Sequence, residues 1–286
     1  MLNSMKFVAM IFVVFAMILC CSVSYADQFR IVIMQEDRDA AARYKPLETY
    51  LIKKGITVSF VPAVNYSSAA TMFSAGTADA MFSGSGVAAI FIMKDIATPV
   101  VRPISKDGSS TYHAVIVAHK GAPKFTGSAD YFKGKKVIFT PLASSGEIFF
   151  RSIPNSMEAD AVLMKAPSHG AAVEILSQGT ADIAIVKNLV WDKLKGKYPN
   201  LISVGGDSNE NPDSTLIVSR KADASIVSAV SAALLSLKDD PTPDAQAVKD
   251  SMAIREFTKT TVADFKHTTE LLKKAGVDKS FNFTFK

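Results

Sequence analysis

Four turns rich in serine or glycine have the composition of an anion-binding site. They follow predicted strands, mostly where a helix begins, and span residues 83–86, 142–146, 166–169 and 211–214. The N–H groups and the dipole of a helix start attract oxyanions, and serine hydroxyls add donors. The alternative is ordinary capping, in which each serine serves only its own helix. Convergence of the four turns on one cleft would distinguish the two interpretations.

Patterns that indicate an enzyme are absent from the sequence or incomplete. Ser85 lies in Ser-Gly-Ser-Gly-Val, which is not the Gly-x-Ser-x-Gly elbow of serine hydrolases. The chain has no His-Glu-x-x-His, no phosphate-binding loop with lysine and no dinucleotide glycine pattern. We therefore expect a protein that is not an enzyme and has no catalytic residue, cofactor or metal. A hydrolase that pairs Ser85 or Ser145 with His169 is the remaining enzyme hypothesis.

Strands and helices that alternate along the chain must position these turns. Short apolar segments predict strands at 29–34, 57–61, 80–82, near 100, and at 114–118, 137–140, 162–164, 183–186, 201–204 and 216–219. Helical segments fill most of the gaps between them, as at 67–75. This alternation predicts an α/β fold with mainly parallel sheets flanked by helices. Ligands of such sheets bind at the carboxyl ends of the strands.

An internal repeat indicates two similar lobes. Residues 73–80 and 176–183 both end a helix at glycine and continue as Thr-Ala-Asp into an apolar strand. The simpler interpretation is a good helix-to-strand connector that occurs twice, but the copies are about one domain apart. Polar breaks at 106–110 and 205–212 predict two crossings between lobes. We expect lobe one at 27–108 plus 214–286, lobe two as the insert 109–213, and a two-strand hinge that lets them close.

The N-terminal segment and the composition predict an exported globular protein. The chain has 286 residues, of which 48% are hydrophobic and 21% charged, and its net charge is +5 with no dense basic block, so nucleic acid is not an expected partner. A charged start, an apolar run at 7–21 and small residues up to Ala26 predict a signal peptide at 1–26, cleaved after Ala26. Lipid anchoring at Cys20 is not expected, since no small residues precede it. Cys20 and Cys21 are the only cysteines, which excludes a disulfide scaffold.

The ordered motifs resemble the solute-binding proteins of bacterial ABC importers for phosphonate, phosphite and phosphate. These proteins form a branch of the two-lobed type II periplasmic binding fold, and the resemblance runs from Phe29 to about Ala275. It rests on matching stretches at 43–51, 76–80, 106–108 with Tyr112, 132–137, 144–146, 168–169 and 211–213. The most diagnostic is Ser-Ser-Gly at 144–146, which looks like the family's Ser-Thr-Ser-Gly turn.

The resemblance implies a set of ligand-binding residues. Ser144, Ser145 and the amide of Gly146 would hold a phosphonyl-type oxyanion, and Tyr112 and His169 would donate hydrogen bonds to it. Asp213 looks like the family's acidic position, which accepts a proton from the oxyanion or meets a ligand cation. Ser83 and Ser85, in the turn after the third strand, complete the expected set.

Two positions depart from the binders of aminoalkylphosphonates in this family. Ser83 stands where those proteins place an aromatic residue, and Leu189 aligns nearest to a second carboxylate that meets the ligand amine. Both departures favour a smaller oxyanion or another ligand. Lys187 is nearby and could contribute positive charge to the site, but we expect it to face solvent.

The resemblance also implies partners and a location. We expect a periplasmic monomer that captures a small oxyanion and delivers it to the membrane permease of an ABC importer. The alternative with the same fold is a sensing subunit that reports the ligand to a membrane sensor kinase.

Overall fold

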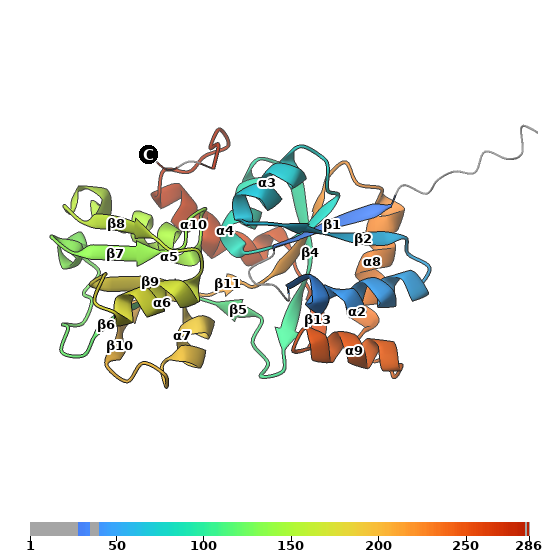
Figure 1. Ribbon diagram of the computed structural model, residues 1–286. Coiled ribbons are helices and arrows are strands. Elements are labelled where there is room, and N and C mark those ends of the chain that lie inside the picture. Colours follow the sequence, from blue (N-terminus) through green and yellow to red (C-terminus); the bar gives the residue numbers. More distant parts are fainter. Residues whose placement is uncertain (1–27, 35–39, 284, 286) are drawn as a thin grey trace, which may run out of the picture.

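The computed structural model describes residues 28–34, 40–283 and 285, and it has two halves, each a sheet flanked by helices (Figure 1). The predicted signal peptide lies outside the described residues. None of the described helices combines the length and apolar character needed to cross a bilayer.

The first half is built on a six-stranded sheet that uses the beginning and the end of the chain. Its elements from the beginning are β1 (Phe29–Met34), α2 (Ala40–Lys53), β2 (Val58–Ala63), α3 (Tyr66–Ser74), β3 (Ala80–Ser83), α4 (Ser85–Met93) and β4 (Ala97–Ser105). Those from the end are β12 (Thr215–Ser219), α8 (Ala224–Ser236), α9 (Pro243–Ser251), β13 (Ile254–Lys259), η3 (Val262–Phe265) and α10 (Lys266–Lys274).

The second half is built on a five-stranded sheet from the middle of the chain. Its elements are β6 (Ala114–His119), η1 (Ala129–Phe132), β7 (Lys136–Phe139), α5 (Ser145–Ser152), η2 (Ser156–Glu158), β8 (Val162–Lys165), α6 (His169–Ser177), β9 (Ile183–Lys187), α7 (Asn188–Leu194) and β10 (Leu201–Gly206). Two short strands, β5 (Thr111–Tyr112) and β11 (Asn211–Pro212), pair with each other between the halves (Figure 1).

The two sheets have the same plan. The first reads β2-β1-β3-β12-β4 with β13 added at its edge, and the second reads β8-β7-β9-β6-β10. The expectation of mainly parallel sheets is wrong in detail, because β12 and β6 each run antiparallel to both neighbours. Each of these strands follows a strand of the β5–β11 pair in the chain. Each therefore begins at the end of the sheet where its neighbour finishes: Thr215 lies opposite Ser83, and Ala114 opposite Lys187.

The repeated Gly-Thr-Ala-Asp segment does the same work in both halves. Gly76 and Gly179 adopt positive φ values of 75° and 76°, where a side chain would strain the backbone. The carboxylate of Asp79 accepts from the backbone N–H of Arg30 in β1 at 2.8 Å, and that of Asp182 accepts from Lys136 in β7 at 2.7 Å. Each aspartate thereby joins the start of one strand, β3 or β9, to the parallel neighbouring strand, β1 or β7.

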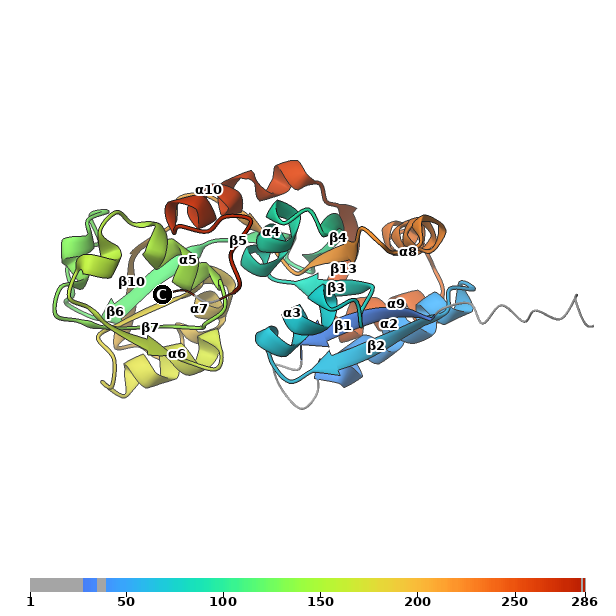
Figure 2. The same ribbon diagram turned by 90° about the horizontal axis from the view of Figure 1, so that it is seen from above.

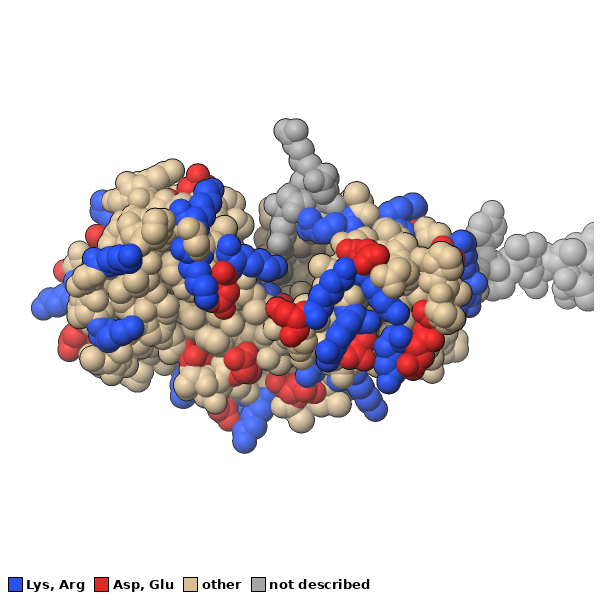
Figure 3. All heavy atoms as spheres, turned by 90° about the horizontal axis from the view of Figure 1, so that it is seen from below, with Lys and Arg blue, Asp and Glu red and all other residues tan. Residues whose placement is uncertain are grey.

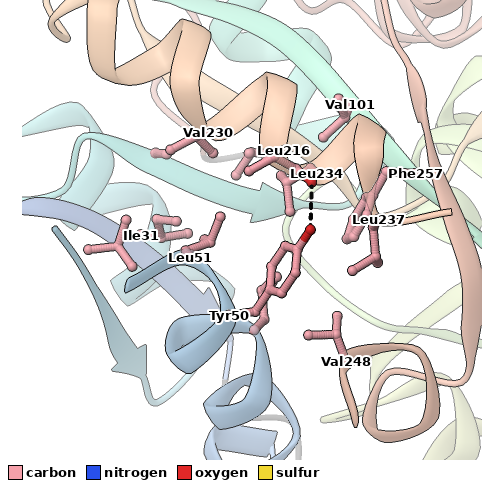
Figure 4. Close-up of a cluster of buried hydrophobic side chains, with 14 of the residues drawn as sticks. Ile31, Tyr50, Leu51, Val101, Leu216, Val230, Leu234, Leu237, Val248 and Phe257 are labelled. Carbon is pink, nitrogen blue, oxygen red and sulfur yellow. Dashed lines mark hydrogen bonds between the residues drawn. The ribbon is translucent and has the colours of Figure 1, made fainter. Parts of the chain in front are cut away.

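Apolar side chains from distant segments form the cores. One cluster lies between the first sheet and helices α2, α8 and α9, and the hydroxyl of Tyr50 donates there to the carbonyl of Ala233 at 3.4 Å (Figure 4). A second cluster, around α4 and α10, also takes in Ala143 and Ile148 from the second half. The two halves therefore share apolar contacts besides the hinge strands.

Helix α10 ties the end of the chain to the hinge. It packs on both α4 and α5, and Figure 2 shows it along the side where the two halves meet. Within it, the buried hydroxyl of Thr268 donates to the side-chain carbonyl of Asn211 at 2.6 Å. Asn211 is only 1% exposed, and its amide nitrogen donates to the backbone carbonyl of Tyr112 at 3.4 Å.

Replacing Thr268 by valine should therefore destabilise the protein. The variant keeps the shape but leaves the amide oxygen of Asn211 buried without a donor, which typically costs about 1–3 kcal/mol. The measurement is the free energy of unfolding from denaturant titration. Thr258→Val, on strand β13, is the control and should change little. Equal stability of Thr268→Val and the wild-type protein would contradict this role of α10.

Candidate oxyanion site between the lobes

A cavity of about 170 Å³ lies at the junction of the two halves. The described residues that line it are Tyr66, Gly84, Gly86, Val87, Tyr112, Leu142, Ala143, Ser144, Ser145, His169, Lys187, Val190, Asp213 and Ser214. Figure 3 shows the surface hollowed between the two halves. The cavity thus sits at the carboxyl ends of β3, β7 and β9, where α/β sheets bind their ligands.

Helices α4, α5 and α6 all begin at this cavity. Their first residues are Ser85, Ser145 and His169, so their N-terminal dipoles and N–H groups gather around one space. Two glycines permit this approach. A Cβ at Gly146 would overlap the carbonyl oxygen of Ile185 in β9, and a Cβ at Gly86 would overlap that of Ala143 across the lobes.

Ser144 and Ser145 have different tasks although they are neighbours. The hydroxyl of Ser144 accepts from the N–H of Glu147 at 3.3 Å and donates its one hydrogen to the carbonyl of Thr140. It is therefore the N-cap of α5. The hydroxyl of Ser145 is buried without any hydrogen-bond partner. Ser145 is thus the serine whose hydroxyl remains available to a bound molecule.

His169 begins α6, directly after its N-cap Ser168. Its Nδ1 atom is buried and has no hydrogen-bond partner. Burial, and to a smaller extent the charge of Lys187, lower the pKa of His169 to about 4, while the charge of Asp213 opposes this shift. The ring is consequently neutral near pH 7, with one nitrogen that donates and one that accepts.

Tyr112 enters the cavity from hinge strand β5. Its hydroxyl lies 2.6 Å from that of Ser85, so one of these groups donates to the other. Burial raises the pKa of Tyr112 above its usual value, so the phenol stays protonated. Ser85 itself is fully buried and does not line the cavity. It positions Tyr112.

Lys187 does not face solvent, contrary to expectation. Its Nζ lies 2.6 and 2.7 Å from the two carboxylate oxygens of Asp213, and 4.6 Å from the centre of the Tyr112 ring. The side chains of Lys187 and Asp213 are only 19% and 20% exposed. Lys187 is the last residue of β9, and the carboxyl ends of the strands are the end of the sheet at which the cavity lies. The rule that ligands bind at the carboxyl ends of strands, which predicted the serine turns, also applies to Lys187.

Ser83 is set apart from the other candidates. Its hydroxyl donates to the carbonyl of Gly84 at 3.0 Å, and it lines an adjoining cavity of about 360 Å³. Tyr66, at the start of α3, lines both cavities, and its hydroxyl oxygen would lie 3.1 Å from a Cβ at Gly84. An aromatic side chain therefore does stand beside the end of β3, but it comes from another element, which the sequence pattern did not reveal.

Three of the eight described non-glycine residues with positive φ lie at the cavity wall. Among the described non-glycine residues with positive φ, Leu142 (65°), Ala143 (55°) and Ser214 (44°) all line the cavity. Such conformations persist where the surroundings impose them, typically at functional sites. Here they turn the chain into the start of α5 and into β12.

The geometry lacks the contact that a serine hydrolase requires. Ser85 is bonded to Tyr112, and the hydroxyl of Ser145 has no base within hydrogen-bond distance. Within the part of the chain that the structure describes, no three His, Cys, Asp or Glu side chains gather to hold a metal ion. What the site offers is two buried polar atoms, Ser145 Oγ and His169 Nδ1, that have no hydrogen-bond partner in the protein.

Two sheets of equal plan, a paired-strand hinge and a cavity lined by both halves define a two-lobed binding protein of the type II periplasmic class. The chain belongs to the family described as "ABC transporter, phosphonate, periplasmic substrate-binding protein", whose family model matches residues 29–265. Members of this family bind and deliver substrates rather than transform them. Comparison of the sequence with the curated proteins gives no match.

Three solved structures illustrate the fold. XAC2383 from Xanthomonas citri bound to ATP has a TM-score of 0.71 and 15% identity, over 88% of this chain and 98% of that one. PhnD1 from Prochlorococcus marinus in complex with methylphosphonate has a TM-score of 0.68 and 16% identity, over 87% and 98%. A histidine kinase sensor domain has a TM-score of 0.54 and 15% identity, over 80% and 98%.

The lowered pKa of His169 predicts a stability that depends on pH. The ordinary value is 6.5 and the folded value about 4, so between them the unfolded chain binds a proton that the folded protein does not. The contribution of His169 to the free energy of unfolding is complete above pH 6.5 and is lost as the pH falls towards 4. Thermal unfolding of the unliganded protein at about pH 7.5 and about pH 5 should show a larger drop for wild type than for His169→Gln. Equal drops would contradict the assignment.

Proposed function

We propose that this protein captures a small oxyanion of the phosphonate, phosphite or phosphate class and delivers it to the membrane permease of an ABC importer. The observation that carries the proposal is the pair of buried atoms without partners, Ser145 Oγ and His169 Nδ1, at one cavity. A buried polar group without a hydrogen bond costs free energy, and an oxyanion between the lobes removes that cost.

Neutral donors and helix starts suit this ligand class. The hydroxyls of Ser145 and Tyr112, the imidazole of His169 and the N–H groups at the start of α5 can donate to several oxygens at once. In a cavity of about 170 Å³, such an arrangement fits a compact anion. The negative charge of the anion is stabilised by the dipoles of the helix starts and by Lys187.

Only the closed arrangement of the lobes brings all the contacts to the ligand together. Gly86 of the first half touches Ala143 of the second, and the donors come from both halves and the hinge. A ligand favours the closed state only through contacts that the open state lacks. Export to the periplasm fits the family and the predicted signal peptide, and places the protein where a permease can receive the ligand.

The second candidate is a sensing subunit that reports the same ligand to a membrane sensor kinase. It draws support from the histidine kinase sensor domain that shares the fold. The two candidates differ in partner and not in site. Ligand-dependent binding to a permease reconstituted in vesicles, measured with the purified protein, supports the importer role, and its absence favours the sensor.

Calorimetry on two serine variants tests the site. Ser145→Ala should reduce the affinity for methylphosphonate or phosphate at least about tenfold, since buried ligand oxygens lose a donor. Ser144→Ala is the matched control: loss of the N-cap should lower the free energy of unfolding by about 0.5–2 kcal/mol with a smaller effect on affinity. Unchanged affinity in Ser145→Ala would place the ligand elsewhere.

A further inference from the structure

Asp213 is the only acidic side chain among the described residues that line the cavity. An unpaired carboxylate in this position would repel an oxyanion. Here both of its oxygens contact the ammonium of Lys187, at 2.6 and 2.7 Å, and the hydroxyl of Ser214 lies 3.2 Å from Oδ1. The repulsion is therefore cancelled within the protein, before any ligand binds.

The same contacts occupy the acceptors that a cationic ligand would need. An ammonium on the ligand would find Asp213 already paired, and would bring a second positive charge against Lys187. The ring of Tyr112 holds Lys187 from another side, with Nζ 4.6 Å from the ring centre. Because both members of the pair are about four-fifths buried, solvent screens this repulsion only weakly.

Lys187 also retains a donor for an anion. An ammonium has three hydrogens, of which Asp213 can accept two. The third is available to a ligand oxygen in the cavity that Lys187 lines.

We propose that Lys187 is a built-in counter-cation that determines specificity: it takes the place of a ligand ammonium on Asp213, and so selects compact oxyanions without a cationic substituent. This inference rests on the proposed function of the site and narrows its ligand class. Phosphate, phosphite and simple alkylphosphonates are accepted, whereas aminoalkylphosphonates are rejected.

The test is calorimetry with methylphosphonate, phosphate and 2-aminoethylphosphonate on the wild type and on Lys187→Met. Wild type should bind methylphosphonate or phosphate at least about a hundredfold more tightly than 2-aminoethylphosphonate. In Lys187→Met, affinity for the simple anions should fall at least about tenfold and that for 2-aminoethylphosphonate should rise, because Asp213 is then unpaired and can receive the ligand amine.

Two further variants keep the test decisive. Lys187→Arg retains the charge and should retain the preference for simple anions, even if Lys187→Met folds poorly. Lys187→Met with Asp213→Asn removes both charges and should restore part of the affinity for methylphosphonate without creating any for the amine.

The outcomes separate the two proposals. A wild type that binds simple anions and the aminophosphonate equally, or a Lys187→Met variant with an unchanged preference, would overturn the role of Lys187 and leave the oxyanion site standing. The same holds for a Lys187→Arg variant that accepts the amine. A wild type that binds none of the three compounds would overturn both.

Discussion

The structure depends on one constraint, that polar atoms removed from water must find partners. Around the cavity almost every such atom is paired within the protein: Ser144 with Thr140, Ser85 with Tyr112, and Lys187 with Asp213. What remains for a ligand is a small set of donors: Ser145 and His169 at the starts of α5 and α6, the hydroxyl of Tyr112 when Ser85 donates to it, and the third hydrogen of Lys187. These unpaired donors form the binding site. Its geometry and its charge both follow from which polar groups already have hydrogen-bond partners within the protein.

The equal plan of the two sheets explains why these donors gather in one place. In each half the strand that leaves the hinge lies beside a strand that ends there, so helix starts from both halves point at the same gap. The β5–β11 pair joins the halves, and α10 packs on both. The Thr268–Asn211 bond links that helix to the hinge. The cavity is thus framed by elements far apart in the sequence.

Much of the fold followed from local pattern. The apolar segments predicted the inner strands of both sheets, because strands buried on both faces are nearly continuous apolar runs. The repeat around Gly76 and Gly179 indicated two similar halves, and the structure gives both copies the same hydrogen bonds. Strand β13 was not predicted. It is an edge strand in which only Ile254 and Phe257 are buried, three positions apart, so it shows neither an apolar run nor a period of two.

The sequence by itself determined the class of fold, the family and the residues at helix starts, since strand, helix and capping signals are carried by neighbours along the chain. Tertiary structure decided the roles of those residues. It left Ser145 without a partner, set Ser83 beside another cavity, and turned Lys187 inward onto Asp213. Such roles depend on pairings between residues separated by up to tens of positions, and only the folded chain brings those partners within hydrogen-bonding distance.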